Sequence, residues 1–285
     1  MNSTLTKLME ISVAAGEAIL EVYHEATMEV SHKADDSPVT EADQRAHELI
    51  IAALAELTPD IPVLSEESAP IPYTTRKQWQ QYWLVDPLDG TKEFIKRNDE
   101  FTVNIALIAN GKPVCGVVHV PVSGVTYVGA IARATAGTIS KTTAAWKCTP
   151  GNKPQPIQAV AMQDKTPLRI AASRTHTTPH LRTVLDHIKA ALGKEAELVC
   201  IGSSLKICLL AEGKVDFYPR LTPTSEWDTA AAHAVLLAAG GQITDISFNP
   251  LTYNQKDNLL NPHFLALADP TYNWQRLLDG CLDGT

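Results

Sequence analysis

Two amphipathic helices are predicted at the start of the chain. In the first, apolar residues recur three or four positions apart, at Leu5, Leu8, Ile11, Ala15, Ala18 and Val22, a spacing typical of a surface helix. The second is expected to begin after Thr40, a suitable N-cap residue, and to end before Pro59. The apolar positions of this second helix also fall on one side.

Short apolar stretches bounded by turn residues predict strands in the middle of the chain. Stretches at 61–65 and 82–86 are followed by acidic residues, and the block from 101 to 132 predicts a meander of three strands. The segment from 133 to 165 has weak periodicity and is the candidate boundary between two lobes. The expected division is therefore residues 1–163, an α+β lobe, and 164–285, an α/β lobe.

Strands and helices alternate in the second half of the chain. Strands are predicted at 168–173, 197–201, 215–220, 242–246 and 263–268, and helices at 178–192, 203–212, 226–239 and near the C-terminus. This alternation favours an α/β fold in which helices and sheets are layered. The chain contains no GxGxxG motif, so dinucleotide binding lacks its usual fingerprint.

Composition limits the classes of function that remain. The net charge of −8 argues against binding a nucleic-acid polymer, which requires clustered Lys and Arg. Five cysteines are scattered without a CxxC pair, so we expect reduced thiols rather than disulfides or zinc. No apolar run approaches the roughly 18 residues of a transmembrane helix, and the N-terminus has the pattern of a helix rather than a signal peptide. We therefore expect a cytoplasmic protein.

Acidic residues stand at the end of a predicted strand or in the first turn of a predicted helix at four places. They are Asp43, Glu66 with Glu67, Asp86 with Asp89, and Asp228. Such positions lie at the edge of a sheet, where α/β proteins collect ligands. Mg²⁺ commonly takes one or two carboxylates together with water and a substrate phosphate. The set of acids therefore suits a magnesium site.

Two of these acids have an equally good structural interpretation. Asp43 follows Thr40 by three positions, and Asp228 follows Ser225 by three. This is the spacing of a helix-capping pair, in which the acid also complements the helix dipole. Capping and metal binding both remain open for these two residues.

The other acids also have alternatives. Glu66 and Glu67 are compatible with a solvated loop, and Asp86 and Asp89 belong to Asp-Pro and Asp-Gly dipeptides that are frequent in turns. The preceding WLV stretch, however, is apolar enough to bury the end of the strand. A buried carboxylate without a cation costs several kcal/mol, so a metal-binding role is favoured for Asp86.

Three motifs in order resemble the inositol monophosphatase superfamily of Mg²⁺-dependent, lithium-sensitive phosphatases. They are LSEES, WLVDPLDGTKEF and EWDTAAAHAVLLAAGG. Within it, the segments SPVTEADQRAHELI, ASRTH and GSSLKICLLAEGKVDFYPR are similar to the 3′(2′),5′-bisphosphate nucleotidases. That branch converts adenosine 3′,5′-bisphosphate, a by-product of sulfate assimilation, to AMP and phosphate. The resemblance implies a sandwich of alternating helices and sheets in two lobes.

The resemblance also implies a set of metal ligands and a water-activating pair. Glu66, Asp86 and the carbonyl of Leu88 would bind the first Mg²⁺, and Asp86, Asp89 and Asp228 the second. A third, weaker ion would use Glu66 and Asp43. Asp43 and the hydroxyl of Thr91 would orient and deprotonate the attacking water.

On the substrate side, the resemblance implies that the phosphate contacts Gly90 and Thr91. The sugar, the 5′-phosphate and the adenine would lie near Ser173, His176, Gly202, Ser203 and Lys206. The metal-site residues Glu66, Leu88, Asp89 and Asp228 would also border the substrate. Alternatives remain for these contacts. Lys206 is also compatible with a solvated helical lysine, and His176 with a structural role. Arg174 or Arg220 could make the contact to the substrate in their place.

Two other functions stay open at this point. One is the same chemistry on inositol phosphate or another small phosphomonoester, and the other is a non-catalytic, metal-dependent nucleotide-binding protein. Some members of the superfamily are dimers, and we expect this protein to be a monomer or homodimer. Peripheral association with the cytoplasmic face of the inner membrane is described for this branch.

Overall fold

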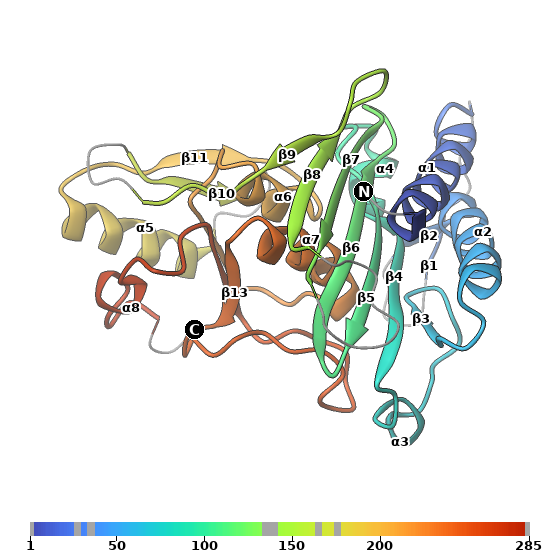
Figure 1. Ribbon diagram of the computed structural model, residues 1–285. Coiled ribbons are helices and arrows are strands. Elements are labelled where there is room, and N and C mark those ends of the chain that lie inside the picture. Colours follow the sequence, from blue (N-terminus) through green and yellow to red (C-terminus); the bar gives the residue numbers. More distant parts are fainter. Residues whose placement is uncertain are drawn as a thin grey trace.

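Helices and sheets alternate in five layers in the computed structural model (Figure 1). The structure describes residues 3–25, 30–32, 38–132, 142–162, 167–173 and 178–282. The helices are α1 (Ser3–Tyr23), α2 (Glu41–Leu57), α3 (Tyr73–Arg76), α4 (Thr91–Ile95), α5 (Pro179–Leu192), α6 (Leu205–Ala211), α7 (Glu226–Ala238) and α8 (Trp274–Leu277). None of these helices is long and apolar enough to cross a membrane.

The larger sheet has seven strands in the order β3-β4-β5-β6-β7-β8-β9. Only β3 and β4 are parallel, and the other neighbours are antiparallel. The strands are β3 (Val63–Ser65), β4 (Gln81–Asp89), β5 (Thr102–Ala109), β6 (Lys112–Val120), β7 (Val125–Ala130), β8 (Ala144–Cys148) and β9 (Gln155–Ile157). A separate antiparallel pair is formed by β1 (Val30–His32) and β2 (Pro38–Thr40).

The smaller sheet has five strands in the order β11-β10-β12-β14-β13. It combines parallel pairing of β10 with β11 and β12 and antiparallel pairing of β14 with β12 and β13. The strands are β10 (Arg169–Ala172), β11 (Glu197–Cys200), β12 (Phe217–Arg220), β13 (Gln242–Asp245) and β14 (Phe264–Leu267). All of them come from the second half of the chain, as the alternating pattern predicts.

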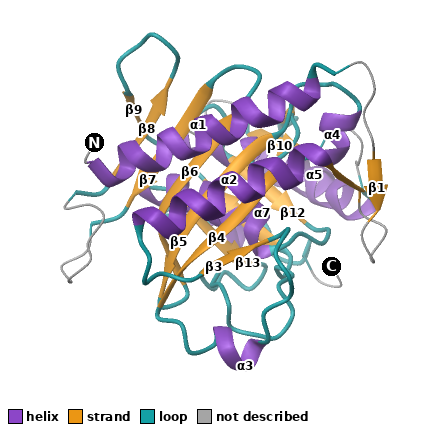
Figure 2. Cartoon of the chain, turned by 90° about the vertical axis from the view of Figure 1, so that its right-hand side faces the viewer, coloured by secondary structure: helices purple, strands orange, loops and turns teal. Residues whose placement is uncertain are grey.

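The pleat of β4 decides which way its side chains face. α1 and α2 lie side by side across the outer face of the larger sheet (Figure 2), while α6 and α7 lie between the two sheets. Tyr82 and Leu84 pack in the core that contains α7, and Trp83 and Val85 pack in the core that contains α1 and α2. Because side chains alternate along a strand, the next residue, Asp86, faces α7.

The layered α/β fold and the two N-terminal helices are confirmed, and two local expectations are wrong. β4 continues to Asp89, so Asp86 and Asp89 do not form a turn that ends the strand. The weakly periodic segment contains β8 and β9 in its described part, which extend the predicted three-stranded meander to five strands. The division into residues 1–163 and 164–285 stays a prediction.

The helix α7 packs directly on the larger sheet where two strands have glycine. A Cβ atom at Gly116 would overlap the backbone of Ala231, and one at Gly129 would overlap the backbone of Val235. The helix lies this close because neither strand position has a side chain. Any side chain at these positions must move α7, and with it the acid in its first turn.

We predict that Gly116→Ala lowers the free energy of unfolding by about 1–3 kcal/mol or more, because the backbone of α7 cannot yield without losing its packing. Urea unfolding followed by circular dichroism measures this value. Lys112→Ala, at an exposed position of the same strand, is the control and should change stability little. Equal stability of the two variants would contradict the prediction.

Candidate active site

A β-bulge brings two aspartates of β4 to one face of the sheet. Asp86 pairs with Asn104 and Asp89 pairs with Thr102, so three steps along β4 match two along β5. Asn104 and Thr102 share a face because they are two residues apart. The extra residue of a bulge shifts the alternation by one position. Asp89 therefore lies on the same side of the sheet as Asp86, facing α7.

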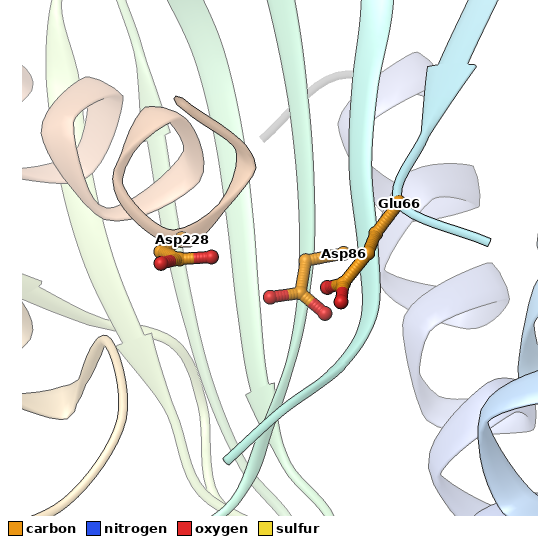
Figure 3. Close-up of side chains that lie close together, drawn as sticks. All are labelled: Glu66, Asp86 and Asp228. Carbon is orange, nitrogen blue, oxygen red and sulfur yellow. The ribbon is translucent and has the colours of Figure 1, made fainter. Parts of the chain in front are cut away.

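Three carboxylates from three elements converge at this point. The carboxylate oxygens of Glu66, Asp86 and Asp228 lie within 4.8 Å of one another. Figure 3 shows Asp228 approaching from the start of α7 and Glu66 from the end of β3, with Asp86 between them. Asp86 is only 1% exposed. Glu66 lies in a half-exposed turn after β3, as the loop interpretation expects, but its carboxylate is also part of the acidic cluster.

Two helix-capping acids also take part in the site. Asp43 Oδ2 accepts hydrogen bonds from the backbone N–H and the hydroxyl of Thr40, both at 2.7 Å. Asp228 Oδ2 accepts from the backbone N–H of Ser225 at 2.9 Å. Capping is confirmed for both, but it uses one oxygen of each carboxylate. Asp43 Oδ1 lies 3.3 Å from the Thr91 hydroxyl, and Asp228 belongs to the acidic cluster.

The electrostatics of the cluster disfavour negative charge. Burial raises the pKa of Asp86 well above its ordinary value, and the neighbouring carboxylates raise it further. Burial, together with the charge of Asp89, raises the pKa of Asp228 to about 8. Either protons or a cation must compensate these groups. Hard oxygen donors gathered in this way fit Mg²⁺.

Asp89 is tied to the loop before α6. Its Oδ2 atom accepts from the backbone N–H of Ser204 at 2.6 Å and lies 3.4 Å from both Thr102 Oγ1 and Asn104 Nδ2. Ser204 Oγ in turn lies 2.9 Å from Thr102 Oγ1 and from Asn104 Oδ1. These three partners are absent from the sequence prediction. Two of them could have been found from the sequence, because Thr102 and Asn104 are alternating polar residues in an otherwise apolar strand.

Hydrogen bonds of Leu88 and Thr91 hold the chain where it passes from β4 to α4. The backbone N–H of Leu88 donates to Asp86 Oδ1 at 3.1 Å, and the Leu88 carbonyl lies 3.4 Å from the Thr91 hydroxyl. Gly90 connects the two elements with a φ of 97°, a conformation that is strained for residues with a side chain. The peptide of Leu88 is thus held beside both Asp86 and the Thr91–Asp43 pair.

A cavity of about 510 Å³ adjoins the cluster. Predicted substrate residues in its wall are Asp89, Gly90, Ser173, Gly202, Ser203, Lys206 and Asp228. Glu66, Leu88 and Thr91 are not among the described residues that line it. His176 and Arg174 lie outside the described residues.

Positively charged side chains also line the cavity. They are Lys92, Lys96, Lys206 and Arg220. Lys206 is 5% exposed, and its Nζ donates to the carbonyls of Ile201 at 3.1 Å and Ser203 at 2.9 Å. Burial lowers its pKa to about 8, so Lys206 is not the solvated lysine of the alternative interpretation. Burial raises the pKa values of Asp89 and Asp228, and the charges of Lys206 and Arg220 act against that rise, so acids and cations share one cavity.

Comparisons with known proteins agree with this geometry. The sequence model of the Inositol monophosphatase family matches residues 1–275. The chain is 48% identical to the 3′(2′),5′-bisphosphate nucleotidase CysQ of Salmonella typhimurium, over 91% of this chain and 98% of that protein. It is 39% identical to the protein of the same name from Haemophilus influenzae, over 96% of each chain.

A solved structure shares the fold at a similar level. The crystal structure of CysQ from Bacteroides thetaiotaomicron, a bacterial member of the inositol monophosphatase family, has a TM-score of 0.78 and 42% identity, covering 94% of this chain and 97% of that one. The likeness covers both sheets, because it extends over nearly the whole chain.

The raised carboxyl pKa values predict how stability depends on pH when divalent ions are removed. Asp86 and Asp228 keep protons in the folded protein that the unfolded chain releases, so their contribution to stability is greatest below their ordinary pKa of 3.8 and falls as pH rises towards 8. We expect the chelated protein to melt at a lower temperature at pH 8 than at pH 6. Added Mg²⁺ should raise the melting temperature, and more so at pH 8.

Two variants assign this effect to the cluster. Asp86→Asn removes one of the repelling charges and should flatten the fall in melting temperature between pH 6 and pH 8. Asp60→Asn, at an exposed position, should leave the fall unchanged. Thermal melts followed by circular dichroism measure the melting temperature at each pH. Identical pH profiles for wild type and Asp86→Asn would contradict the prediction.

Proposed function

The chain belongs to the inositol monophosphatase family, and we propose that it is a magnesium-dependent 3′(2′),5′-bisphosphate nucleotidase. It hydrolyses the 3′-phosphate of adenosine 3′,5′-bisphosphate to give AMP and phosphate. The observation that carries this conclusion is the acidic cluster of Glu66, Asp86 and Asp228 beside a cavity that is also lined by Lys92, Lys96, Lys206 and Arg220. Its relatives of 39% to 48% identity are bisphosphate nucleotidases by name.

The donor set fits magnesium. Family members depend on a metal, and this chain offers carboxylate oxygens from three elements within 4.8 Å. We propose that Glu66, Asp86 and the Leu88 carbonyl hold one ion, and that Asp86, Asp89 and Asp228 hold a second. A third, weaker ion would use Glu66 and Asp43. Bound Mg²⁺ supplies Lewis-acid chemistry, in that it neutralises phosphate charge and lowers the pKa of water.

The residues of the chain then orient and deprotonate the attacking water. Asp43 is 2% exposed and its Oδ2 is held by Thr40, so its Oδ1 has a fixed direction towards the Thr91 hydroxyl. As water attacks phosphorus, Thr91 Oγ1 takes its proton and passes its own to Asp43. The bond between phosphorus and the 3′-oxygen breaks, and the leaving oxygen is protonated from solvent. Positioned acid–base groups of this kind contribute roughly 10²–10⁴-fold to rate.

The cavity offers cations as well as acids to a substrate with two phosphates. The reacting 3′-phosphate would lie at the carboxylate cluster, near Gly90 and Thr91. The second phosphate would contact Lys206 and Arg220, which line the same cavity, and the nucleoside would pass Ser173, Gly202 and Ser203. An inositol monophosphate has no second phosphate for these cations. On the basis of the resemblance to this branch, we also propose that the protein is a cytoplasmic monomer or homodimer. It is either free or peripherally bound at the cytoplasmic face of the inner membrane.

A substrate panel tests the proposed activity. The purified protein should hydrolyse adenosine 3′,5′-bisphosphate with a kcat/KM at least about tenfold above that for inositol 1-phosphate, because only the nucleotide has a second phosphate for Lys206 and Arg220. Chelation should abolish turnover and added Mg²⁺ should restore it. A clear preference for inositol phosphate, or rates unaffected by chelation, would contradict the proposal.

The water-activating pair is tested by Thr91→Val, which preserves shape but removes the hydroxyl. We expect kcat at saturating Mg²⁺ to fall roughly 10²–10⁴-fold, while the rise in melting temperature on adding Mg²⁺ stays as in wild type. Thr74→Val, exposed in α3, is the control. If Thr91→Val retained the wild-type kcat, the role of this pair would have to be abandoned.

A further inference from the structure

The first turn of α7, which carries an acidic ligand, is enclosed by the segment 253–261. The backbone N–H of Glu226 donates to the carbonyl of Leu259 at 2.8 Å. The side-chain amide of Asn261 donates to the carbonyl of Ser225 at 2.7 Å. The segment therefore fixes the position from which α7 begins.

Arg76, at the end of α3, holds this segment from the other side. Its guanidinium is 2% exposed and donates to Asn254 Oδ1 at 2.5 Å, to the carbonyl of Lys256 at 3.1 Å, and to the carbonyl of Asp257. Asn254 Nδ2 donates back to the Arg76 carbonyl at 2.7 Å. A buried guanidinium that spreads its donors over one short segment fixes that segment in more than one direction.

Asn254 connects Arg76 to α7. Its backbone N–H donates to Glu226 Oε2 at 2.8 Å, and Glu226 is 2% exposed. Asn254 has a φ of 56°, a left-handed conformation that asparagine adopts more readily than most residues. Its side chain thus faces Arg76 while its N–H faces Glu226. The result is a continuous, buried chain of contacts from α3 to the first residue of α7.

This chain of contacts spans the two halves of the acidic cluster. Arg76 lies in the connection between β3 and β4, the two strands that present Glu66 and Asp86. Hydrogen bonds between β3 and β4 fix these two acids relative to each other. Asp228 comes from a different element, so its distance from the pair depends on where α7 starts. α3 lies at the lower end of the molecule in Figure 1.

We propose that Arg76, Asn254 and Glu226 form a brace that sets Asp228 against Glu66 and Asp86, which makes all three positioning residues for the metal site. The proposal rests on the proposed function, since it assigns the cluster to Mg²⁺. The hydrogen bonds of the three residues described above run to one another and to the segment 253–261. Their effect is on the geometry that the ion meets, and outer partners of this kind typically change metal affinity by 10- to 100-fold.

Asn254→Gly tests the brace most cleanly. Glycine accepts the left-handed backbone and keeps the N–H that donates to Glu226, so only the link to Arg76 is lost. We expect the Mg²⁺ concentration for half-maximal activity to rise about 10- to 100-fold, with kcat at saturating Mg²⁺ within about threefold of wild type. Mg²⁺ titration calorimetry without substrate should show the same loss of affinity. A purely structural role would lower thermal stability but leave the affinity of the folded protein unchanged.

Three further variants complete the test. Arg76→Met should weaken Mg²⁺ binding like Asn254→Gly, and Glu226→Gln, which keeps the acceptor oxygen, should stay near wild type. Tyr73→Phe is the matched control, because the Tyr73 hydroxyl donates to the Gln255 carbonyl at 2.9 Å, a contact between α3 and the same segment that does not reach Glu226. Folded Asn254→Gly with wild-type Mg²⁺ affinity would overturn the brace. A wild-type protein that neither binds Mg²⁺ nor turns over substrate would instead overturn the proposed function.

Discussion

The main constraint on this structure is that its buried carboxylates repel one another and need a positive charge to offset that repulsion. Glu66, Asp86 and Asp228 bring oxygens within 4.8 Å of one another, and Asp86 is almost fully buried. Desolvation and like charge both raise the pKa of Asp86. Such an arrangement lowers the stability of the metal-free fold. Three local features of the fold hold the acids together against that repulsion: the bulge in β4, the helix caps and the close approach of α7 to the larger sheet.

Each of these features fulfils a structural and a chemical requirement with the same residues. Asp43 and Asp228 cap their helices with one oxygen, which orients the carboxylate and directs it to the site. The bulge in β4 places Asp89 on the face of Asp86, and a hydrogen bond from Ser204 fixes Asp89 to the cavity loop. The orientation of the site therefore comes from backbone hydrogen bonds rather than from long, mobile side chains.

Local patterns predicted much of this molecule, because helix caps, strand alternation and the spacing of acids depend on neighbouring residues. The caps at Thr40 and Ser225 follow from such patterns, whereas the meeting of Glu66, Asp86 and Asp228 was implied by the resemblance of their motifs to the inositol monophosphatase superfamily. Other features depend on contacts between residues far apart in the chain. The bulge between Asp86 and Asp89 is visible only from its pairing with β5. The burial of Lys206 and the contacts of Arg76 with residues about 180 positions away require the assembled layers, as do the strands β8 and β9, whose apolar contacts come from their neighbours.

The carboxylate cluster is built to hold divalent cations. The most direct measurement is the anomalous difference map of a crystal grown with Mn²⁺ as a substitute for Mg²⁺. A peak at coordination distance, roughly 2.0–2.2 Å, from oxygens of Glu66, Asp86 and Asp228 is the predicted result. Carboxylates turned away from one another, with no anomalous signal between them at saturating Mn²⁺, would contradict it.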